Sequence, residues 1–421
     1  MGKINFQFMV VAVVSAISLI VYILTTDSLT AYLQPLAIMS YRFILDSERL
    51  PGDSNLPYDD WIMKNVSSVS ADLKRKQPEN RTKLYNPPLK KILFWNDFYG
   101  DKTFGFGFGR EPFLRAKCAV NTCITTANRT MFPLADIDAI VWHARSGDKS
   151  FPAKRSPHTR YIFWLLESPI HLYLNSESYT NVFNWTFTYK LDSDIKIPYG
   201  RVYRRRKPLL PSYRNYAVGK SKLAAWVVSH CGASSGRDHL FRTLKRWLPI
   251  DMYGGCGPFK CKTGFGDPNN CHTMLSADYK FYVAFENSLC QDYATEKFFN
   301  VLRLDMVPVV YGFGNYSAQA PPHSYIDALS FPTAKALADY LIYLNNNDTA
   351  YNEYFRWKRF HRVPIEGINF VKSYCDLCER LHTDTTPKMY NLTKWFIEDS
   401  HCKTYRDKDI SDFVNGVNIT S

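Results

Sequence analysis

Residues 279–312 read YKFYVAFENSLCQDYATEKFFNVLRLDMVPVVYG, and this stretch contains the pattern that decides the fold class. The apolar runs KFYVAF and MVPVVYG are short and rich in Val, Phe and Tyr, which is typical of buried strands. Residues 292–304, between these runs, have a helical pattern. A strand, a helix and a strand in this order predict an α/β domain.

The segment ENSLCQDYATEK, residues 286–297, is polar although apolar runs flank it on both sides. Its charged and hydrogen-bonding side chains are Glu286, Asn287, Asp292, Tyr293, Glu296 and Lys297. A solvated loop would have such a composition, and so would a ligand site at the carboxyl end of a strand. The residues alone leave both interpretations open.

The same alternation of strand-like runs and helical patterns recurs along the chain. The other strand-like runs are KKILFWN, IDAIVWHA, RYIFWLLES, FNWTFTYKL, KLAAWVVSHC and LPIDMYGGCG, and further helical patterns cover residues 236–248 and 334–347. The basic, irregular stretch 197–222 contains few apolar runs, and we predict that it links two domains. The pattern therefore predicts two doubly wound α/β domains, 90–216 and 217–374, followed by a polar tail, 375–421.

The beginning of the chain has the pattern of a membrane anchor. Residues 4–26 carry no charge and reach the ~20 residues that cross a bilayer. A cleaved signal peptide would have a shorter apolar region of ~7–15 residues and a small-x-small cleavage site, which this run lacks. We therefore predict a cytosolic tail and transmembrane anchor at 1–26. Residues 27–89, rich in Pro, Ser, Asn, Asp and Lys, are predicted to be a stem.

Cysteines and glycosylation motifs place the remaining chain in a lumen. The ten cysteines are an even number, none lies in the predicted anchor, and an oxidising compartment would pair them. Acceptor motifs N-x-S/T occur at Asn65, Asn80, Asn128, Asn184, Asn315, Asn347, Asn391 and Asn418. Their spread outside the anchor is consistent with the secretory pathway, although the sequence does not tell which of them carry glycan.

The net charge of +13 predicts an acidic ligand, and nucleic acid, an anionic glycan and membrane headgroups would fit it equally well. The basic run 201–207 resembles a nucleic-acid contact, but a lumenal location argues against that partner. We interpret this run as part of the solvated linker.

Three short motifs have a structural as well as a functional interpretation. FGFGFGRE, residues 104–111, does not match G-x-G-x-x-G, and the residues REPFLRAKC are a poor helix opening, so we interpret it as a flexible aromatic loop. Asp192 and Asp194 form a D-x-D that could hold Mg²⁺ or Mn²⁺ on a diphosphate or could form a turn. Cys375 and Cys378 form one C-x-x-C with no matching pair, which favours two adjacent disulfides to separate partners over zinc.

Four segments, in this order, resemble the α1,3-fucosyltransferases of glycosyltransferase family ten. They are FNWTFTYKLDSDIKIPYG (183–200), KLAAWVVSHCGASSGRDHLFRTLKRWLPIDMYGGCG (222–257), YKFYVAFENSLCQDYATEKFFN with VPVVYGFGNYSAQAPPHSYI (279–326) and LADYLIYLNNNDTAYNEYFRWK (337–358). The resemblance covers about residues 91–378, and its third segment is the most specific. It implies the GT-B architecture, in which two Rossmann-like domains face a cleft. It also implies a single-pass type II Golgi membrane protein.

The activity that the resemblance implies is transfer of fucose, with inversion, from GDP-fucose to the 3-hydroxyl of a GlcNAc. In this family the C-terminal domain binds the donor. The residues that match its donor-binding positions are Arg237, Glu286, Asn287, Tyr293, Glu296 and Lys297. The resemblance assigns Arg237 and Lys297 to the diphosphate, where fixed cations stabilise the charge that develops as the sugar leaves. It assigns Glu286 and Glu296 to donor hydroxyl groups or the guanine base.

The resemblance also assigns the catalytic base and the acceptor side. An inverting transfer needs one base to take the proton of the acceptor, and the motif WLLESP assigns this role to Glu167. The motif VWHARS assigns His143 and Arg145 to the acceptor. The chain departs from the vertebrate Lewis-type enzymes at Ala144, which usually is a second histidine, and at His230, which in many relatives is asparagine.

The acceptor stays open at this point. SHC, YGGCG and the extra cysteines resemble the invertebrate members that modify the innermost GlcNAc of N-glycans. The alternatives are a peripheral LacNAc or LacdiNAc unit, a glycan-binding membrane protein that has lost catalysis, and a basic adhesion protein. Donor binding in GT-B transferases requires no metal, so the resemblance favours a structural D-x-D and no cofactor, with Mn²⁺ stimulation left open. Oligomeric state and disulfide connectivity are not predicted.

Overall fold

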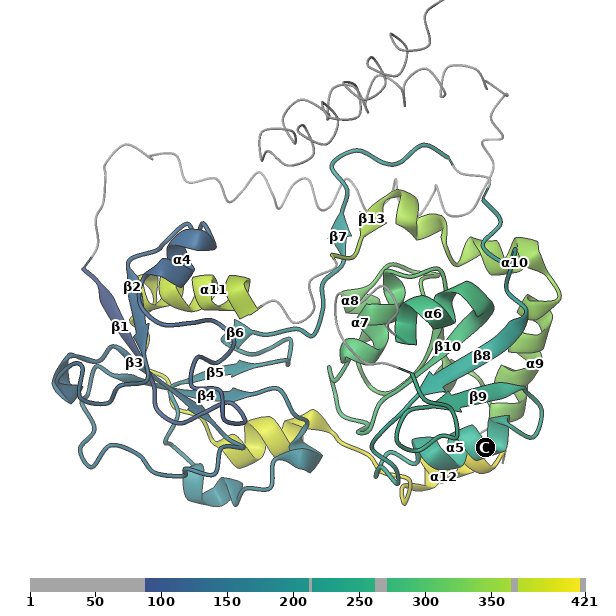
Figure 1. The fold of residues 1–421 in the computed structure, drawn as a ribbon. Helices are drawn as coiled ribbons and strands as arrows, with labels where there is room; N and C mark the ends of the chain where they lie inside the picture. Colours follow the sequence, from purple (N-terminus) through teal and green to yellow (C-terminus); the bar gives the residue numbers. More distant parts are fainter. Residues whose placement is uncertain (1–87, 212–213, 262–270, 365–369, 417–421) are drawn as a thin grey trace, which may run out of the picture. The chain divides into compact units, whose positions relative to one another are not determined.

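Most strands of the chain form two parallel sheets in the computed structural model, which describes residues 88–211, 214–261, 271–364 and 370–416. The first sheet consists of β1 (Lys90–Phe94), β2 (Cys123–Thr126), β3 (Ala139–His143), β4 (Arg160–Leu165), β5 (Trp185–Thr188) and β6 (Ile195–Lys196). The second consists of β8 (Lys222–Val227), β9 (Ile250–Tyr253), β10 (Tyr279–Phe285), β11 (Val307–Tyr311) and β12 (Ile326–Asp327). Both sheets, shown in Figure 1, belong to one compact unit, residues 85–421. The predicted α/β class with two parallel sheets is confirmed.

The order of the strands is the same in both sheets. The first sheet has the order β2-β1-β3-β4-β5-β6, and the second, read from β9, has the order β9-β8-β10-β11-β12. In each sheet the chain first adds a strand on one side of the starting strand and then continues on the other side. Such a reversal leaves a crevice at the carboxyl ends of the two central strands, where ligands of doubly wound sheets bind.

The central strands are apolar because both of their faces are covered. Every residue of β3, β10 and β11 is buried, which explains the continuous apolar runs AIVWH, YKFYVAF and VPVVY. The helices around the sheets are α4 (Glu111–Arg115), α5 (Arg237–Leu244), α6 (Cys271–Asp278), α7 (Glu296–Leu302), α8 (Tyr316–Gln319), α9 (Ala334–Asn345) and α10 (Asp348–Glu353). Within the predicted helical range 292–304, the helix α7 begins only at Glu296, because residues 286–295 form a loop after β10.

The end of the chain contributes to the cores of both sheets. Helix α11 (Phe370–Thr383) lies beside α4 (Figure 1), and its Tyr374 packs against Phe94 and Phe106 of the first sheet's domain. Helix α12 (Lys408–Asn415) packs against α5, and its Phe413 stacks on Tyr311 of the second sheet. Phe396 and Phe413 both lie in the segment predicted as a polar tail, 375–421, and they are buried against Phe163 of the first sheet and Tyr311 of the second.

All described cysteines are paired. The disulfides are Cys118–Cys375, Cys123–Cys378, Cys231–Cys256, Cys261–Cys271 and Cys290–Cys402. The first two join the C-x-x-C of α11 to two separate cysteines of the N-terminal domain, which confirms the interpretation of this motif. Because they close loops of 257 and 255 residues, they restrict the unfolded chain strongly.

The linker between the sheets is held by pairing and by hydrogen bonds. Strand β7 (Tyr203–Arg204) pairs in antiparallel fashion with β13 (His361–Arg362). In the basic run 201–207, Arg205 donates its Nε to the carbonyl oxygens of Lys358 and His361, at 3.1 and 3.0 Å. At least one arginine of this run therefore has a structural role, because it joins the linker to residues 358–361.

The predicted anchor, 1–26, lies outside the described residues, as does the predicted stem up to residue 87. Among the residues that the structure describes, no helix has the length and apolar character needed to span a membrane.

Candidate active site

The residues predicted to bind the donor gather at the carboxyl ends of β8 and β10, where the strand order of the second sheet reverses. Glu286 follows β10 directly and is completely buried. Its carboxylate accepts hydrogen bonds from the backbone N–H and the hydroxyl of Thr295, at 2.8 and 2.9 Å. Thr295 is the N-cap residue of α7, so Glu286 links the end of the strand to the beginning of the next helix.

Lys297 lies in the first turn of α7, between two carboxylates. Its Nζ is 3.3 Å from Oε2 of Glu286 and 3.0 Å from Oε1 of Glu296. Burial lowers the pKa of Lys297, but the charges of the two carboxylates outweigh burial and raise it above its ordinary value. Burial also raises the pKa of Glu286. The site therefore holds a protonated ammonium group that neutralises a buried acid.

Lys297 and Glu296 are exposed enough for a ligand to reach them, whereas Glu286 is not. The side chain of Lys297 is 23% exposed and that of Glu296 is 42% exposed, whereas Glu286 is fully enclosed. Glu286 is thus placed to hold Lys297 in position, and Glu296 can leave Lys297 for a hydroxyl group of a ligand. An anion that reaches Lys297 would replace Glu296 as its partner.

Arg237 is the first residue of α5 and lies beside the same strand ends. Its guanidinium donates to the carbonyl oxygens of Phe285, at 3.1 Å, and His230, at 2.6 Å. The side chain is 2% exposed, and its Nε has no partner among the described residues. Because arginine stays charged in proteins, Arg237 adds a fixed positive charge to this crevice.

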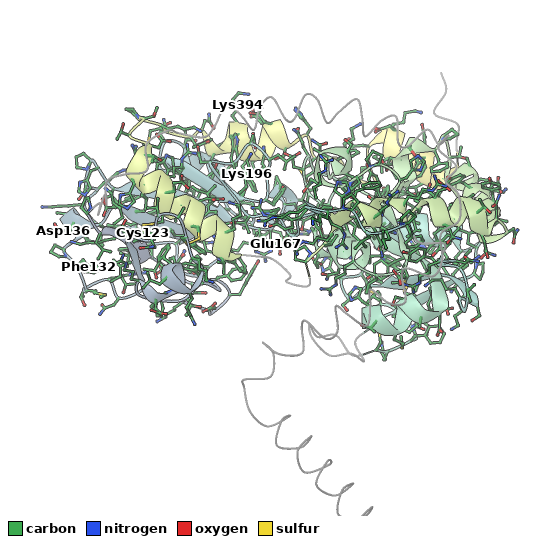
Figure 2. All side chains as sticks on the ribbon, turned by 90° about the horizontal axis from the view of Figure 1, so that it is seen from above. Cys123, Phe132, Asp136, Glu167, Lys196 and Lys394 are labelled. Carbon is green, nitrogen blue, oxygen red and sulfur yellow. A yellow bond between two sulfur atoms is a disulfide. The ribbon has the colours of Figure 1, made fainter. Side chains whose placement is uncertain are left out.

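Glu167 comes from the first sheet. It follows β4 by two residues, is half-buried and is labelled in Figure 2. Its Oε2 lies 3.5 Å from the hydroxyl of Tyr293, which belongs to the polar segment 286–297 of the second domain. Next to this contact, the hydroxyl of Ser168 donates to that of Ser288 at 2.7 Å. The predicted base and the predicted donor segment are therefore in direct contact.

The two residues predicted for the acceptor differ in their surroundings. The side chain of His143 is fully buried, and its Nδ1 lies 2.8 Å from the carbonyl oxygen of Asp97. Burial lowers the pKa of His143 to about 4, so its imidazole is neutral at neutral pH. Arg145 is half-buried, and its guanidinium lies over the ring of Tyr99. In this structure Arg145 is accessible to a ligand, whereas the buried ring of His143 packs against Phe98, Tyr99 and Trp164.

Several residues of this region were not singled out from the sequence. Thr295 and Ser235 hold Glu286, the first through its carboxylate and the second through its backbone carbonyl, at 2.8 Å. Burial raises the pKa of the Tyr99 phenol, and the charge of the nearby Glu167 raises it further. Small hydroxyl side chains and single tyrosines are too common in sequences to signal such roles by themselves.

The D-x-D is tied to the C-terminal segment. The carboxylate of Asp194 is 3% exposed and accepts hydrogen bonds from five groups. These are the backbone N–H and hydroxyl of Thr186, the guanidinium of Arg380, the ammonium of Lys388 and the hydroxyl of Tyr390. Asp192 accepts from Nε1 of Trp395 at 3.0 Å. These contacts support a structural role for both acids.

We expect Asp194→Asn to lower the free energy of unfolding by about 1.5–3 kcal/mol, because charge-assisted hydrogen bonds to Arg380 and Lys388 are lost. At a temperature where the variant is folded, the KM for GDP-fucose should equal that of the unchanged protein, with or without Mn²⁺. Thermal unfolding and donor kinetics would measure both effects. A normal Tm together with a raised donor KM that Mn²⁺ restores would instead identify Asp194 as a metal ligand.

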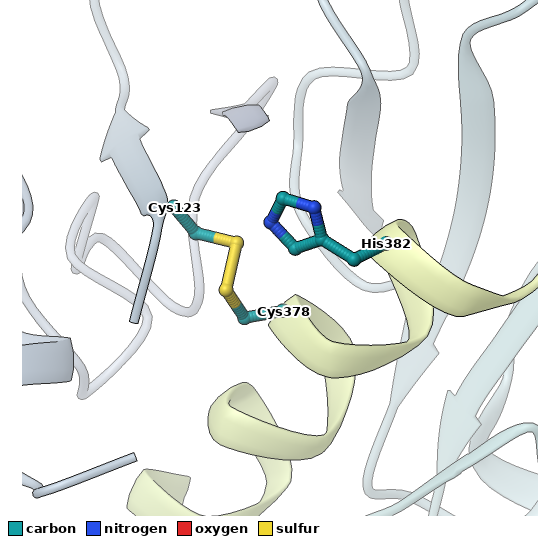
Figure 3. Close-up of side chains that lie close together, drawn as sticks. All are labelled: Cys123, Cys378 and His382. Atoms are coloured by element: carbon teal, nitrogen blue, oxygen red, sulfur yellow. A yellow bond between two sulfur atoms is a disulfide. The ribbon is translucent and has the colours of Figure 1, made fainter. Parts of the chain in front are cut away.

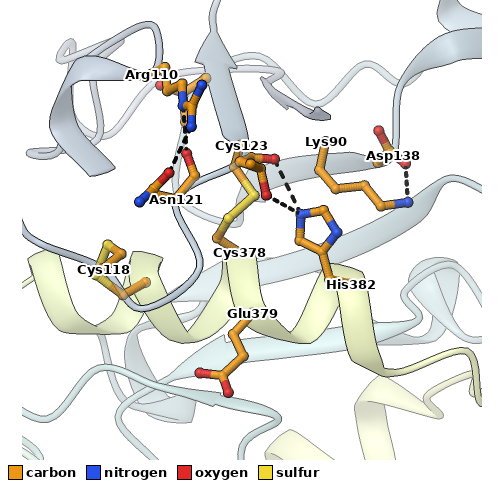
Figure 4. The surroundings of a disulfide bond; sticks show 12 residues. Lys90, Arg110, Cys118, Asn121, Cys123, Asp138, Cys378, Glu379 and His382 are labelled. Atoms are coloured by element: carbon orange, nitrogen blue, oxygen red, sulfur yellow. Dashed lines mark hydrogen bonds and ion pairs between the residues drawn. A yellow bond between two sulfur atoms is a disulfide. The ribbon is translucent and has the colours of Figure 1, made fainter. Parts of the chain in front are cut away.

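One group with the composition of a metal site occurs among the described residues. Possible ligand atoms of Cys123, Cys378 and His382 lie within 4.8 Å of one another (Figure 3). The two sulfur atoms form a disulfide, and Nε2 of His382 lies 3.2 Å from the carbonyl oxygen of Thr122 (Figure 4). The disulfide occupies both sulfurs, and the three residues together fasten α11 to β2.

Comparisons with known proteins match both domains of the chain to one family. Family models described as "Glycosyltransferase family 10 (fucosyltransferase) C-term" and "Fucosyltransferase, N-terminal" match residues 217–395 and 87–200. The chain is 35% identical over 362 residues to α-(1,3)-fucosyltransferase C of Drosophila melanogaster, covering 79% of this chain and 82% of the relative. It is 36% identical over 364 residues to glycoprotein 3-α-L-fucosyltransferase A of the same organism, covering 83% and 67%.

A solved structure of an α1,3-fucosyltransferase with GDP-fucose also resembles this chain. The alignment has a TM-score of 0.46 and 16% sequence identity, and it covers 75% of this chain and 96% of the other.

Proposed function

The chain belongs to glycosyltransferase family 10, the fucosyltransferases, and is an inverting GDP-fucose-dependent α1,3-fucosyltransferase; from this premise we propose that it fucosylates the innermost GlcNAc of N-glycans. This acceptor is supported by the similarity to a relative named a glycoprotein 3-α-L-fucosyltransferase. The disulfide Cys231–Cys256 supports it too, because it joins the SHC and YGGCG segments that resemble the core-modifying members. We further propose that the protein is a single-pass type II protein of the Golgi membrane, with the described residues in the lumen.

The donor would bind at the carboxyl ends of β8 and β10, in a GT-B arrangement of the two domains. We assign Lys297 and Arg237 to the diphosphate, where their fixed charges stabilise the leaving GDP more strongly than bound GDP-fucose. Glu296, freed from Lys297 by the diphosphate, would accept hydrogen bonds from donor hydroxyl groups. Glu286 would hold Lys297 through the 3.3 Å ion pair, and Asn287 would complete the pocket with an amide oxygen that has no partner among the described residues.

Glu167 would act as the general base. Its carboxylate takes the proton of the acceptor 3-hydroxyl while that oxygen forms a bond to C1 of fucose. The bond from C1 to the diphosphate oxygen breaks at the same time, and GDP leaves with the electron pair. Because Lys297 and Arg237 take up the developing charge, this step requires neither a general acid nor a metal ion.

The observation that carries this assignment is the contact of Glu167 with Tyr293. It places a carboxylate of the first domain beside the donor segment of the second, with 3.5 Å between Oε2 and the tyrosine hydroxyl. The general base and the cations that bind the donor must lie close together, because the acceptor oxygen has to approach C1 of fucose.

The acceptor can be tested with the soluble protein from the stem onward. We expect incubation with GDP-fucose and a paucimannose glycopeptide to add one fucose to the innermost GlcNAc, detected by mass spectrometry of the product. LacNAc and LacdiNAc acceptors should react far more slowly. Transfer to LacNAc alone would contradict the core acceptor and leave the fucosyltransferase activity intact. Binding of GDP without transfer to any acceptor would indicate a glycan-binding protein.

A further inference from the structure

Two exposed tyrosines flank the guanidinium of Arg145 near the proposed base. The Cζ atom of Arg145 lies 4.8 Å from the ring centre of Tyr173 and 5.8 Å from that of Tyr99. Tyr173 is 70% exposed and Tyr99 is 55% exposed, which is unusual for rings of this size in a folded protein. Within the described part of the chain, the Arg145 guanidinium has no carboxylate or carbonyl as a hydrogen-bond partner. We call these three residues the Tyr–Arg–Tyr surface.

Both tyrosines have a strained backbone conformation. Tyr99 and Tyr173 have φ values of +51° and +49°, in the left-handed region that bulky residues rarely adopt. The surrounding contacts maintain this conformation: the ring of Tyr173 meets His171, whose Nδ1 lies 3.0 Å from the tyrosine hydroxyl. Residues held in such conformations are concentrated at ligand sites.

His171 supplies an independent indication of a ligand. It lies in the short helical turn η2 (Pro169–His171), four residues after Glu167, and is 9% exposed. Nδ1 of His171 is in hydrogen-bond contact with the hydroxyl of Tyr173, and its Nε2 has no partner among the described residues. A buried polar atom without a partner is costly unless a ligand or water satisfies it. The ring of His230, from the second domain, lies 5.9 Å away.

We propose that the Tyr–Arg–Tyr surface and His171 bind the acceptor beyond its reactive GlcNAc, and that Tyr173 selects extended acceptors. The proposal rests on the fucosyltransferase function given above. Tyr99 lies near Glu167, whose charge acts on its phenol, so Tyr99 borders the place of the reacting sugar. The ring of Tyr173 lies 4.8 Å from Cζ of Arg145, so in this proposal it meets the next unit of the glycan. Tyrosine offers the apolar face of a pyranose a flat ring, and Arg145 and His171 offer N–H donors to its hydroxyl groups.

The test compares an extended acceptor, chosen as the one that the unchanged protein uses best, with a simple β-GlcNAc glycoside bearing a small aglycone. We expect Tyr173→Ala to raise the KM for the extended acceptor by about five- to tenfold, the size expected for the loss of one aromatic contact. Its kcat and its KM for GDP-fucose should stay unchanged, as should kcat/KM for the simple glycoside. Tyr173→Phe keeps the ring and should stay within about twofold of the unchanged protein.

Tyr343→Ala serves as a matched control, because Tyr343 is 52% exposed and lies on α9 of the second domain. Tm values of all variants would show that folding is retained. An unchanged KM for the extended acceptor in Tyr173→Ala, or an equal loss on both acceptors, would overturn the proposal. Failure of the unchanged protein to transfer fucose to any acceptor would instead contradict the proposed function, so the two failures are distinguishable.

Discussion

Glu167→Gln is expected to lower kcat by about 10²–10⁴-fold, the usual contribution of a positioned general base. Glutamine keeps the size of the side chain and its contact with the Tyr293 hydroxyl, but it cannot take up the proton of the acceptor. The affinity for GDP should therefore remain close to that of the unchanged protein. Initial-rate kinetics and calorimetry with GDP would measure the two quantities on the same preparation.

Glu177→Gln is a suitable control for this variant, since Glu177 is an exposed acid of the same domain and lies in the helical turn η3 (Ser176–Tyr179). Its kcat should not change. Near-normal turnover of Glu167→Gln, with product confirmed by mass spectrometry, would place the base elsewhere. Loss of GDP binding together with turnover would indicate a structural role for Glu167.

Lys297→Met should lower kcat/KM for GDP-fucose by about 10²–10³-fold, because a preorganised cation no longer stabilises the leaving diphosphate. The variant should also be less stable by about 1–3 kcal/mol, since the fully buried Glu286 loses its counter-charge. Titration with GDP and thermal unfolding would separate the two effects.

A second substitution distinguishes donor binding from folding at this position. Lys297→Met with Glu286→Gln removes both members of the buried pair, so most of the stability should return while donor binding stays weak. Lys335→Met, at an exposed lysine of α9 that pairs with Asp339, should change neither quantity. Full recovery of kcat/KM in the double variant would show that Lys297 serves only to neutralise Glu286.

Local patterns in the sequence were sufficient to predict the α/β class. The runs around β10 and β11 are apolar throughout because both faces of a central parallel strand are buried, and this composition needs no long-range information. The position of Glu167 after an apolar run, and of Lys297 at the beginning of a helix, followed from the same alternation. The roles of these residues came from their resemblance to a family, because a half-exposed acid and a lysine on a helix are common in any protein.

Local patterns could not predict the contacts that depend on tertiary structure. Helix α11 is a polar, cysteine-containing segment in the sequence, and only the fold brings Tyr374 to the rings of Phe94 and Phe106. The resemblance placed His143 at the acceptor, yet the surrounding rings bury it completely. The burial of a side chain depends on neighbours that are distant in the chain, and a single sequence does not record them.

The sequence by itself determined the main strands of both sheets, the helical patterns of α5, α7 and α9, and the cluster of charged residues between 286 and 297. These features follow from periodicity and composition, which act over a few residues. Only the tertiary structure decided which groups face one another: Glu167 and Tyr293 from two domains, Lys297 between two acids, and Arg145 between two tyrosines. Such contacts join residues that are up to 126 positions apart, so they exist only once both sheets have folded.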